Sequence, residues 1–135
     1  MSFCWERKSC SLTEQLKQEA GTSIVLEPVD KWQRVEGCVR QTSSTCTYNI
    51  LDEFYEDPER YAYTFQHYVF MSRYLQEIQS RSASLPLRIM ERSVFSDRMV
   101  FVESVYEKGW MSDMELSLFN GWYDPVVKVR QLIDV

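Results

Sequence analysis

Charged side chains follow two short apolar runs of this sequence, at the point where each run ends. Glu27 comes directly after the run 24–26, and Glu91 and Arg92 come directly after the run 87–90. A buried parallel strand delivers charged groups to the ligand-binding edge of an α/β sheet in this way. A carboxylate there can take the proton of a substrate hydroxyl, and a second can hold Mg²⁺. An arginine can offset the charge of a phosphoryl group in transfer. The alternative, a structural Glu91–Arg92 pair at a helix start, stays open.

Aromatic and polar side chains of a kind that binds planar ligands accompany these charges. The aromatic residues are Trp32, Phe54, Tyr55, Phe65 and Phe101. An amide, a guanidinium and a carboxylate are supplied by Gln66, Arg73 and Asp97. Together they could stack on a nucleobase and hydrogen-bond its edge. Aromatic residues at helical spacing are more often core residues, and the polar trio shifts the balance toward a ligand site.

The elements that would position these residues indicate an α/β fold with a parallel sheet flanked by helices. Strands are expected at 3–5, 24–26 and 87–90, and a short helix at 12–20. Ser and Thr without periodicity at 37–47 predict a flexible loop or insertion. No hairpin signal separates the strands, which favours parallel pairing. The length of 135 residues predicts a single domain over the whole chain.

The remaining helices are predicted from capping residues and apolar periodicity. A helical stretch is expected from Asn49, and Asp57-Pro58 restarts it, because Asp is a favoured N-cap and Pro suits the first helical position. Apolar residues at three- and four-residue steps then predict one face of a long helix over 61–78. Another helix is expected from Ser93 to about Lys108. A capping-box pattern at its start predicts a last helix over 112–122.

Cysteine, histidine and charge usage exclude several classes of function. None of the four cysteines stands in a C-x-x-C pair or at zinc-like spacing, so reduced thiols are expected. His67 is the only histidine, which excludes a multi-histidine metal site and a Ser-His-Asp triad. A net charge of -5 without a Lys/Arg run argues against a nucleic-acid partner. We expect no membrane partner, because no apolar stretch reaches membrane-spanning length and no signal-peptide pattern follows Met1.

Four motifs in a fixed order carry a resemblance to a known family. The motif E-P-V-x-x-W lies in LEPVDKWQ (26–33). The motifs D/E-P-E-R and T-F-Q lie in NILDEFYEDPERYAYTFQHYVFMSR (49–73), and E-R-S-V-x-S-D-R lies in MERSVFSDRMVF (90–101). These runs resemble the deoxyribonucleoside kinases, above all the deoxycytidine/deoxyguanosine kinase branch and its plant-type members. The resemblance covers residues 22–127, and the tail 128–135 diverges from it. A chance match to all four motifs is not credible.

The resemblance implies a P-loop kinase fold, usually a homodimer, that transfers the γ-phosphoryl group of ATP to the 5′-hydroxyl of a deoxynucleoside in nucleotide salvage. It places Glu27 and Arg92 by the 5′-hydroxyl and Glu91 by the phosphates and Mg²⁺; either glutamate can be called the base. It implies that Trp32, Phe65 and Phe101 frame the base and that Leu51 and Phe54 line the pocket. It also implies that Tyr55 hydrogen-bonds the 3′-hydroxyl. The base edge would be recognised by Gln66, Arg73 and Asp97. The family includes cytosolic and mitochondrial members, so the cytoplasm or the mitochondrion is expected.

Two departures from the family pattern bear on activity. The family needs a G-x-x-x-x-G-K-S/T loop for the ATP phosphates, and this sequence has FCWERKSC at 3–10, in which Lys8 and Ser9 resemble a weak remnant. After 124–127 the arginine-rich lid of the family does not follow. We therefore expect a truncated or misannotated kinase that is inactive by itself. The alternatives are a non-catalytic nucleoside-binding module that pairs with a full-length relative, and a fragment without function. The preferred deoxynucleoside is not predicted.

Overall fold

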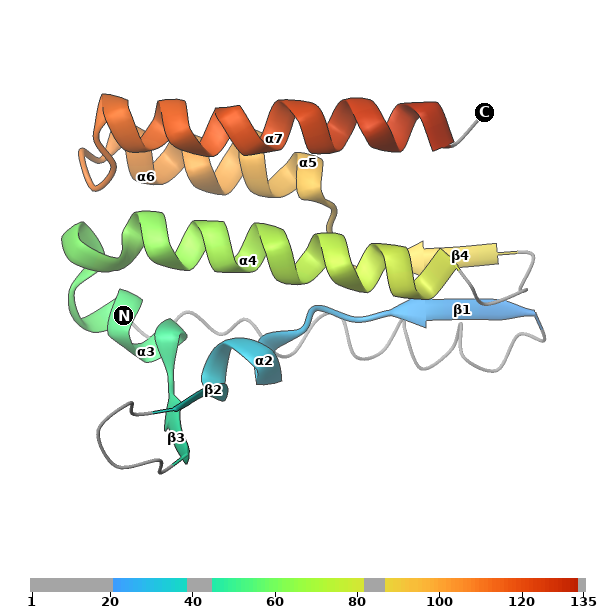
Figure 1. Ribbon diagram of the computed structural model, residues 1–135, viewed down its shortest axis with the longest axis horizontal. Helices are drawn as coiled ribbons and strands as arrows, with labels where there is room; N and C mark the ends of the chain where they lie inside the picture. The colour runs from blue at the N-terminus through green and yellow to red at the C-terminus, as the bar shows by residue number, and fades with distance from the viewer. Residues whose placement is uncertain (1–20, 39–44, 82–86, 134–135) are drawn as a thin grey trace.

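The computed structural model describes residues 21–38, 45–81 and 87–133, and Figure 1 shows its elements in order. β1 (Thr22–Val25) and β4 (Leu87–Met90) pair in parallel, with Thr22 opposite Leu87 and Val25 opposite Met90. The predicted α/β class with a parallel strand pair is confirmed, since helices flank this pair. The strand expected at 3–5, the helix expected at 12–20, and Lys8 and Ser9 lie outside the described residues.

The long helix α4 (Pro58–Arg81) runs alongside the strand pair (Figure 1). It starts as predicted, because the Oδ1 atom of Asp57 accepts a hydrogen bond from the N–H of Arg60 at 3.3 Å. The preceding helix α3 (Ile50–Glu56) also starts as predicted, and the Oδ1 atom of Asn49 accepts from the N–H of Asp52 at 3.1 Å. Both helices therefore begin where a side chain satisfies a free N–H group of the first turn.

Three segments follow one another without a break after Ser93: α5 (Val94–Ser96), η1 (Asp97–Val102) and α6 (Glu103–Glu107). The predicted helix from Ser93 is thus confirmed, but its middle part is a π-helix, which the periodicity did not indicate. α7 (Asp113–Ile133) starts at the predicted capping box, where the N–H of Ser112 donates to Glu115 at 2.8 Å. Among the described residues, no helix has the length and apolar character to cross a membrane.

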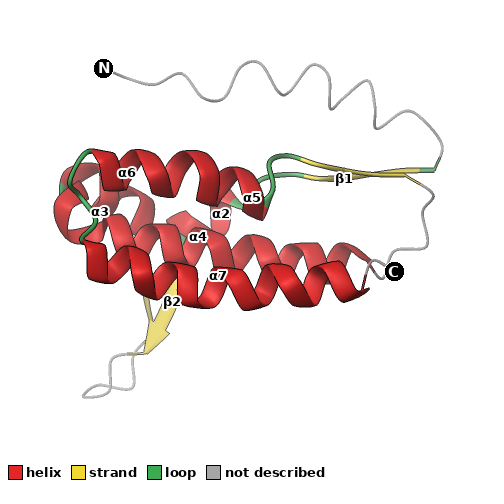
Figure 2. Cartoon of the chain, turned by 90° about the horizontal axis from the view of Figure 1, so that it is seen from above, coloured by secondary structure: helices red, strands yellow, loops and turns green. Residues whose placement is uncertain are grey.

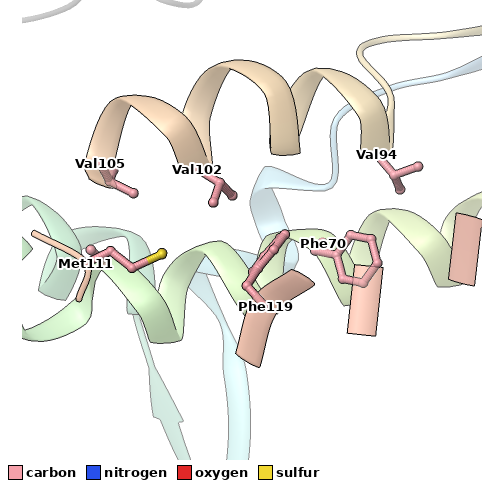
Figure 3. Packing of buried hydrophobic residues seen from close by; sticks show 7 residues of the cluster. Phe70, Val94, Val102, Val105, Met111 and Phe119 are labelled. Atoms are coloured by element: carbon pink, nitrogen blue, oxygen red, sulfur yellow. The ribbon is translucent and has the colours of Figure 1, made fainter. Parts of the chain in front are cut away.

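The helix α7 extends beyond the predicted end near Trp122 because its inner face continues to pack. Tyr123 and Val126 are partly buried against the main core, and the helix accommodates Pro125 within its length. That core lies between α4, the α5–η1–α6 run and α7, and Figure 3 shows its side chains converging. Its buried members are Ala62, Phe70, Val94, Val102, Val105, Met111 and Phe119.

An antiparallel strand pair corrects both ends of the flexible loop expected over 37–47, whereas residues 39–44 lie outside the described residues. β2 (Val35–Cys38) pairs with β3 (Thr45–Tyr48), and the pair projects away from the helices in Figures 1 and 2. The pairing places Tyr48 beside Gly37, where an added Cβ would lie 2.7 Å from the ring. Cross-strand contacts of this kind stabilise a ladder without a recognisable turn signal in the sequence.

Candidate functional site

The two strand-end carboxylates lie at the same edge of the parallel pair, as the sequence predicts. The N–H of Glu91 donates to the carbonyl of Val25 at 2.9 Å, which continues the ladder past the end of both strands. The Oε2 atom of Glu91 lies 3.4 Å from the N–H of Glu27 and accepts a hydrogen bond from it. Parallel strands end at one common edge, so residues 64 positions apart in the sequence become neighbours.

Arg73 of α4 joins both strand ends to η1. Its Nη2 atom forms an ion pair with Oε1 of Glu27, and its Nη1 atom donates to the carbonyl of Glu91 at 3.0 Å. Its Nε atom lies 2.6 Å from Oδ2 of Asp97. The side chain is only 3% exposed. Arginine suits this position because its planar guanidinium carries five N–H donors in a fixed geometry and stays charged when buried.

Arg92 contacts the same carboxylate from the end of the neighbouring strand β4. Its Nη1 atom lies 3.3 Å from Oε1 of Glu27, and its guanidinium lies 4.8 Å from the ring centre of Phe101. The backbone of Arg92 has a φ of 63°, a left-handed conformation that non-glycine residues adopt mainly at turns and functional sites. Partial burial lowers the pKa of Arg92, while the charge of Glu27 opposes that shift.

The carboxylate of Glu27 is asymmetrically engaged. Its Oε1 atom accepts hydrogen bonds from both Arg73 and Arg92, whereas no residue in the described part of the chain donates to its Oε2 atom. The side chain is 13% exposed, so a ligand can reach it. One oxygen therefore orients the group and the other is available to accept a hydrogen bond from a ligand hydroxyl.

Asp97 is the buried carboxylate at the start of η1. Burial raises its pKa to about 6, and the nearby charge of Glu27 also raises it, whereas Arg73 and Arg92 act in the opposite direction. Burial outweighs the ion pair with Arg73 because a carboxylate removed from water loses more hydration than one shared guanidinium restores.

Stability is expected to fall with rising pH through the titration of Asp97. Its pKa is raised from 3.8 to about 6 on folding, so the folded chain holds this proton more tightly and the contribution is lost as pH rises through 6. Between pH 4.5 and 7, the loss amounts to about 2 kcal/mol. Urea unfolding of the wild-type chain and of Asp97→Asn at both pH values measures it. A stability difference between the two proteins that stays constant with pH would contradict this assignment.

An aromatic cluster borders these charged groups. Trp32 lies on α2 (Val29–Gln33), a short helix that the sequence did not predict, and its ring meets Phe65 edge-on at 5.8 Å and 85°. Phe54 stacks on the other side of Phe65 at 4.8 Å, and Leu51 packs against the same cluster. Phe101 lies beside the charged groups, where its ring contacts the guanidinium of Arg92. Tyr55 is 60% exposed and contacts Phe54 at 5.7 Å, so its hydroxyl lies outside this cluster.

Gln66 is a largely buried polar residue of α4. It is 4% exposed and makes no hydrogen bond to any residue in the ranges that the structure describes. It directly follows Phe65 on α4, and its amide atoms do not belong to the fully buried, unpaired side-chain atoms of the described residues.

The donor set at the strand ends fits a magnesium ion shared with a substrate. Within the described ranges, no three His, Cys, Asp or Glu side chains gather as a metal site. Mg²⁺ is commonly bound by one or two carboxylates together with substrate phosphates and water, so the single carboxylate of Glu91 is sufficient. Among the described residues, only the 3.4 Å bond from Glu27 engages that carboxylate.

The sequence interpretation missed two side chains that hold the site together. Ser72 accepts a hydrogen bond from the indole N–H of Trp32 at 2.9 Å, and Gln76 donates to the carbonyl of Leu26 at 2.7 Å. The available signal was helical spacing, since Ser72 follows Phe65 by seven residues and lies on the same face of α4. Spacing alone does not say which other element meets that face.

The fold and the site define an α/β protein in which charged and aromatic side chains gather at the ends of its parallel strands. The family model for deoxynucleoside kinases matches residues 8–135 of this chain. The chain therefore belongs to the deoxynucleoside kinase family.

Curated relatives at 33–36% identity agree with this family. The mitochondrial deoxyguanosine kinase of Xenopus laevis is 36% identical over 109 residues, with 75% of this chain and 41% of the relative covered. The deoxycytidine kinases of Mus musculus and Homo sapiens are 34% and 33% identical over 111 residues, with 75% of this chain and 43% of each relative covered. The chain thus spans about two fifths of the length of these relatives.

Proposed function

We propose that this chain carries the deoxynucleoside-binding part of a kinase that transfers the γ-phosphoryl group of ATP to a 5′-hydroxyl. The observation that carries the proposal is the asymmetric carboxylate of Glu27. Arg73 and Arg92 hold one of its oxygens, and the other is available to a hydroxyl. Phosphoryl transfer needs an oriented hydroxyl and stabilised charge more than covalent chemistry from the protein, and this arrangement offers both.

At the hydroxyl end, each residue has a proposed role. Glu27 accepts the hydrogen of the 5′-hydroxyl and orients its oxygen, and Arg92 places positive charge beside it. Glu91 would hold Mg²⁺, which offsets phosphate charge when bound. Lys8 and Ser9 are the proposed ATP contacts, and they lie outside the described residues.

At the base end, the amide of Gln66, which makes no hydrogen bond to another described residue, supports recognition of a nucleobase edge. We assign the edge to Gln66, Arg73 and Asp97, because amide, guanidinium and carboxyl groups complement the donors and acceptors of a base. Trp32, Phe65 and Phe101 supply the apolar walls, with Leu51 and Phe54 behind them. The exposed hydroxyl of Tyr55 is assigned to the 3′-hydroxyl of the sugar.

A second candidate function is a non-catalytic module that binds the nucleoside or pairs with a full-length kinase. The sequence FCWERKSC at 3–10, where the family has a glycine-rich loop, favours this candidate. For partners, we propose that the chain forms a homodimer or pairs with a full-length kinase. Support comes from the exposed apolar side chains Leu118, Trp122 and Val129, which recur on one face of α7. For compartment, we propose the mitochondrion or the cytoplasm; the name of the Xenopus laevis relative places that enzyme in mitochondria.

Calorimetry with deoxycytidine, deoxyguanosine and deoxyadenosine tests the binding part of this proposal. We expect one of them to bind, and Gln66→Leu to weaken that binding about 10-fold or more, because the base edge loses its amide partner. The control is Gln79→Leu, an exposed glutamine on the same helix. Failure of all three nucleosides to bind would contradict the kinase and the nucleoside-binding module, and would leave only the module that pairs with a full-length kinase.

A phosphoryl-transfer assay separates the two candidates. ATP-dependent turnover that Glu27→Gln abolishes would support the kinase acting alone. Nucleoside binding without turnover would support the module, and is the expected result for the 135-residue chain because its sequence lacks the glycine-rich pattern that holds ATP phosphates.

A further inference from the structure

Ser72 makes two hydrogen bonds that together determine where its hydroxyl points. Its Oγ atom donates to the carbonyl of Val69 at 2.9 Å and accepts from the indole N–H of Trp32 at 2.9 Å. A hydroxyl has one hydrogen to donate, and the bond to Val69 uses it. The oxygen therefore presents a lone pair to the indole, and the N–H of Trp32 must lie in line with it.

Two further residues of α4 restrict the same indole ring. Phe65 meets it edge-on at 85°, and the guanidinium of Arg73 lies 5.4 Å from the ring centre. Phe65, Ser72 and Arg73 are seven and eight residues apart, so one face of α4 contacts the edge, the N–H and the face of the ring. Only the bond to Ser72 acts on the N–H, and it limits rotation of the indole about its Cβ–Cγ bond, the rotation that tilts the plane of the ring.

The helix that carries Trp32 cannot supply this orientation by itself. α2 has five residues, and no side chain caps its first turn. A helix of this length is not stable alone and takes its position from tertiary contacts. Contacts with α3 and α4 therefore position α2, and those with Phe65, Ser72 and Arg73 of α4 orient the indole.

We propose that Ser72 is a positioning residue of the nucleoside pocket, which holds the plane of Trp32 so that the ring can serve as a wall for the base. This inference rests on the proposed function. Both hydrogen-bonding capacities that the structure shows for Ser72 are used internally, so it acts on the ligand only through Trp32. The class of ligand that requires such a wall is a planar heterocycle, whose stacking energy depends on ring orientation.

The test combines an indole signal with nucleoside affinity. In ¹H–¹⁵N spectra, the indole N–H of Trp32 is one of four and is assigned with Trp32→Phe. In Ser72→Ala, we expect this N–H to shift and to exchange faster with D₂O. We also expect the dissociation constant of the nucleoside that the wild type binds to rise about 5- to 10-fold. Ser72→Thr keeps the hydroxyl and should restore both. The control is Ser117→Ala, which removes a 2.7 Å bond to the carbonyl of Asp113 on α7.

Each outcome decides the proposal. An unchanged indole signal or unchanged affinity in Ser72→Ala overturns it, and so does Ser117→Ala if it weakens binding equally. If Ser72→Ala does not fold, Ser72→Cys takes its place, because a thiol is a weak acceptor of similar size. A wild-type chain that binds no nucleoside overturns the proposed function and with it this role. If Ser72→Ala still shifts the indole N–H signal of Trp32 in a chain that binds no nucleoside, the hydrogen bond exists and only the proposed function is wrong.

Discussion

Replacing Arg73 with methionine is expected to lower the free energy of unfolding by about 3–5 kcal/mol at pH 7, the cost of breaking a buried ion pair. The substitution leaves the buried carboxylate of Asp97 without its partner at 2.6 Å and removes the donor to the carbonyl of Glu91. It also removes one of the two arginines on Glu27. Urea unfolding followed by circular dichroism measures the change.

The matched control for this substitution is Arg60→Met, on the exposed side of the same helix. Arg60 contacts the ring of Tyr61 at 5.2 Å and is expected to cost less than about 1 kcal/mol. The double variant Arg73→Met/Asp97→Ala should cost less than the sum of the single changes, because the unpaired charge is removed together with its partner. Equal costs for Arg73→Met and Arg60→Met would show that the buried ion pairs do not form in solution.

Replacing Phe119 with alanine is expected to lower the free energy of unfolding by about 3–5 kcal/mol through the cavity that it leaves. The ring is 1% exposed and lies next to Phe70 of α4 in the main core (Figure 3). It contacts Phe70 at 5.4 Å and Tyr123 at 6.4 Å between ring centres. Thermal and urea unfolding of the purified chain measure the loss, which is a large part of the stability of a small domain.

An exposed leucine of α4 supplies the control for this core substitution. Leu75 is 50% exposed, and Leu75→Ala is expected to change stability by about 0.5 kcal/mol or less. Phe119→Leu keeps most of the buried volume and should cost less than Phe119→Ala. If both alanine variants behave alike, α7 does not pack on α4 through Phe119 and the core described above is wrong.

The strand-end carboxylates were predictable because their signal is local. An apolar run that stops at a charge indicates the end of a buried strand, and parallel strands share one edge. Glu27 and Glu91 could therefore be placed together before any coordinates. The helix starts at Asn49, Asp57, Ser93 and Ser112 were predictable for a similar reason, since capping depends on residues three positions apart.

The strand pair of β2 and β3 and the π-helix η1 could not be predicted in this way. The ladder from Val35 opposite Tyr48 to Cys38 opposite Thr45 is stabilised across strands, and its Ser- and Thr-rich sequence carries no turn signal that periodicity detects. In η1, the helix accommodates Asp97 and Val102 as buried residues on a wider turn. A π-helix is rare and differs from an α-helix in its i→i+5 hydrogen bonds, so helix preference and apolar periodicity give no signal for it.

The sequence by itself determined the family, the parallel strands and the set of side chains available for chemistry, because these depend on residue types and short spacings. Only the tertiary structure decided which of those side chains contact one another. Arg73 binds Glu27, 46 residues away, and the carbonyl of Glu91, 18 residues away, while Ser72 binds Trp32 across 40 residues. Contacts over such separations form only when a helix face and the strand ends are packed together, and no local pattern specifies which residues meet there.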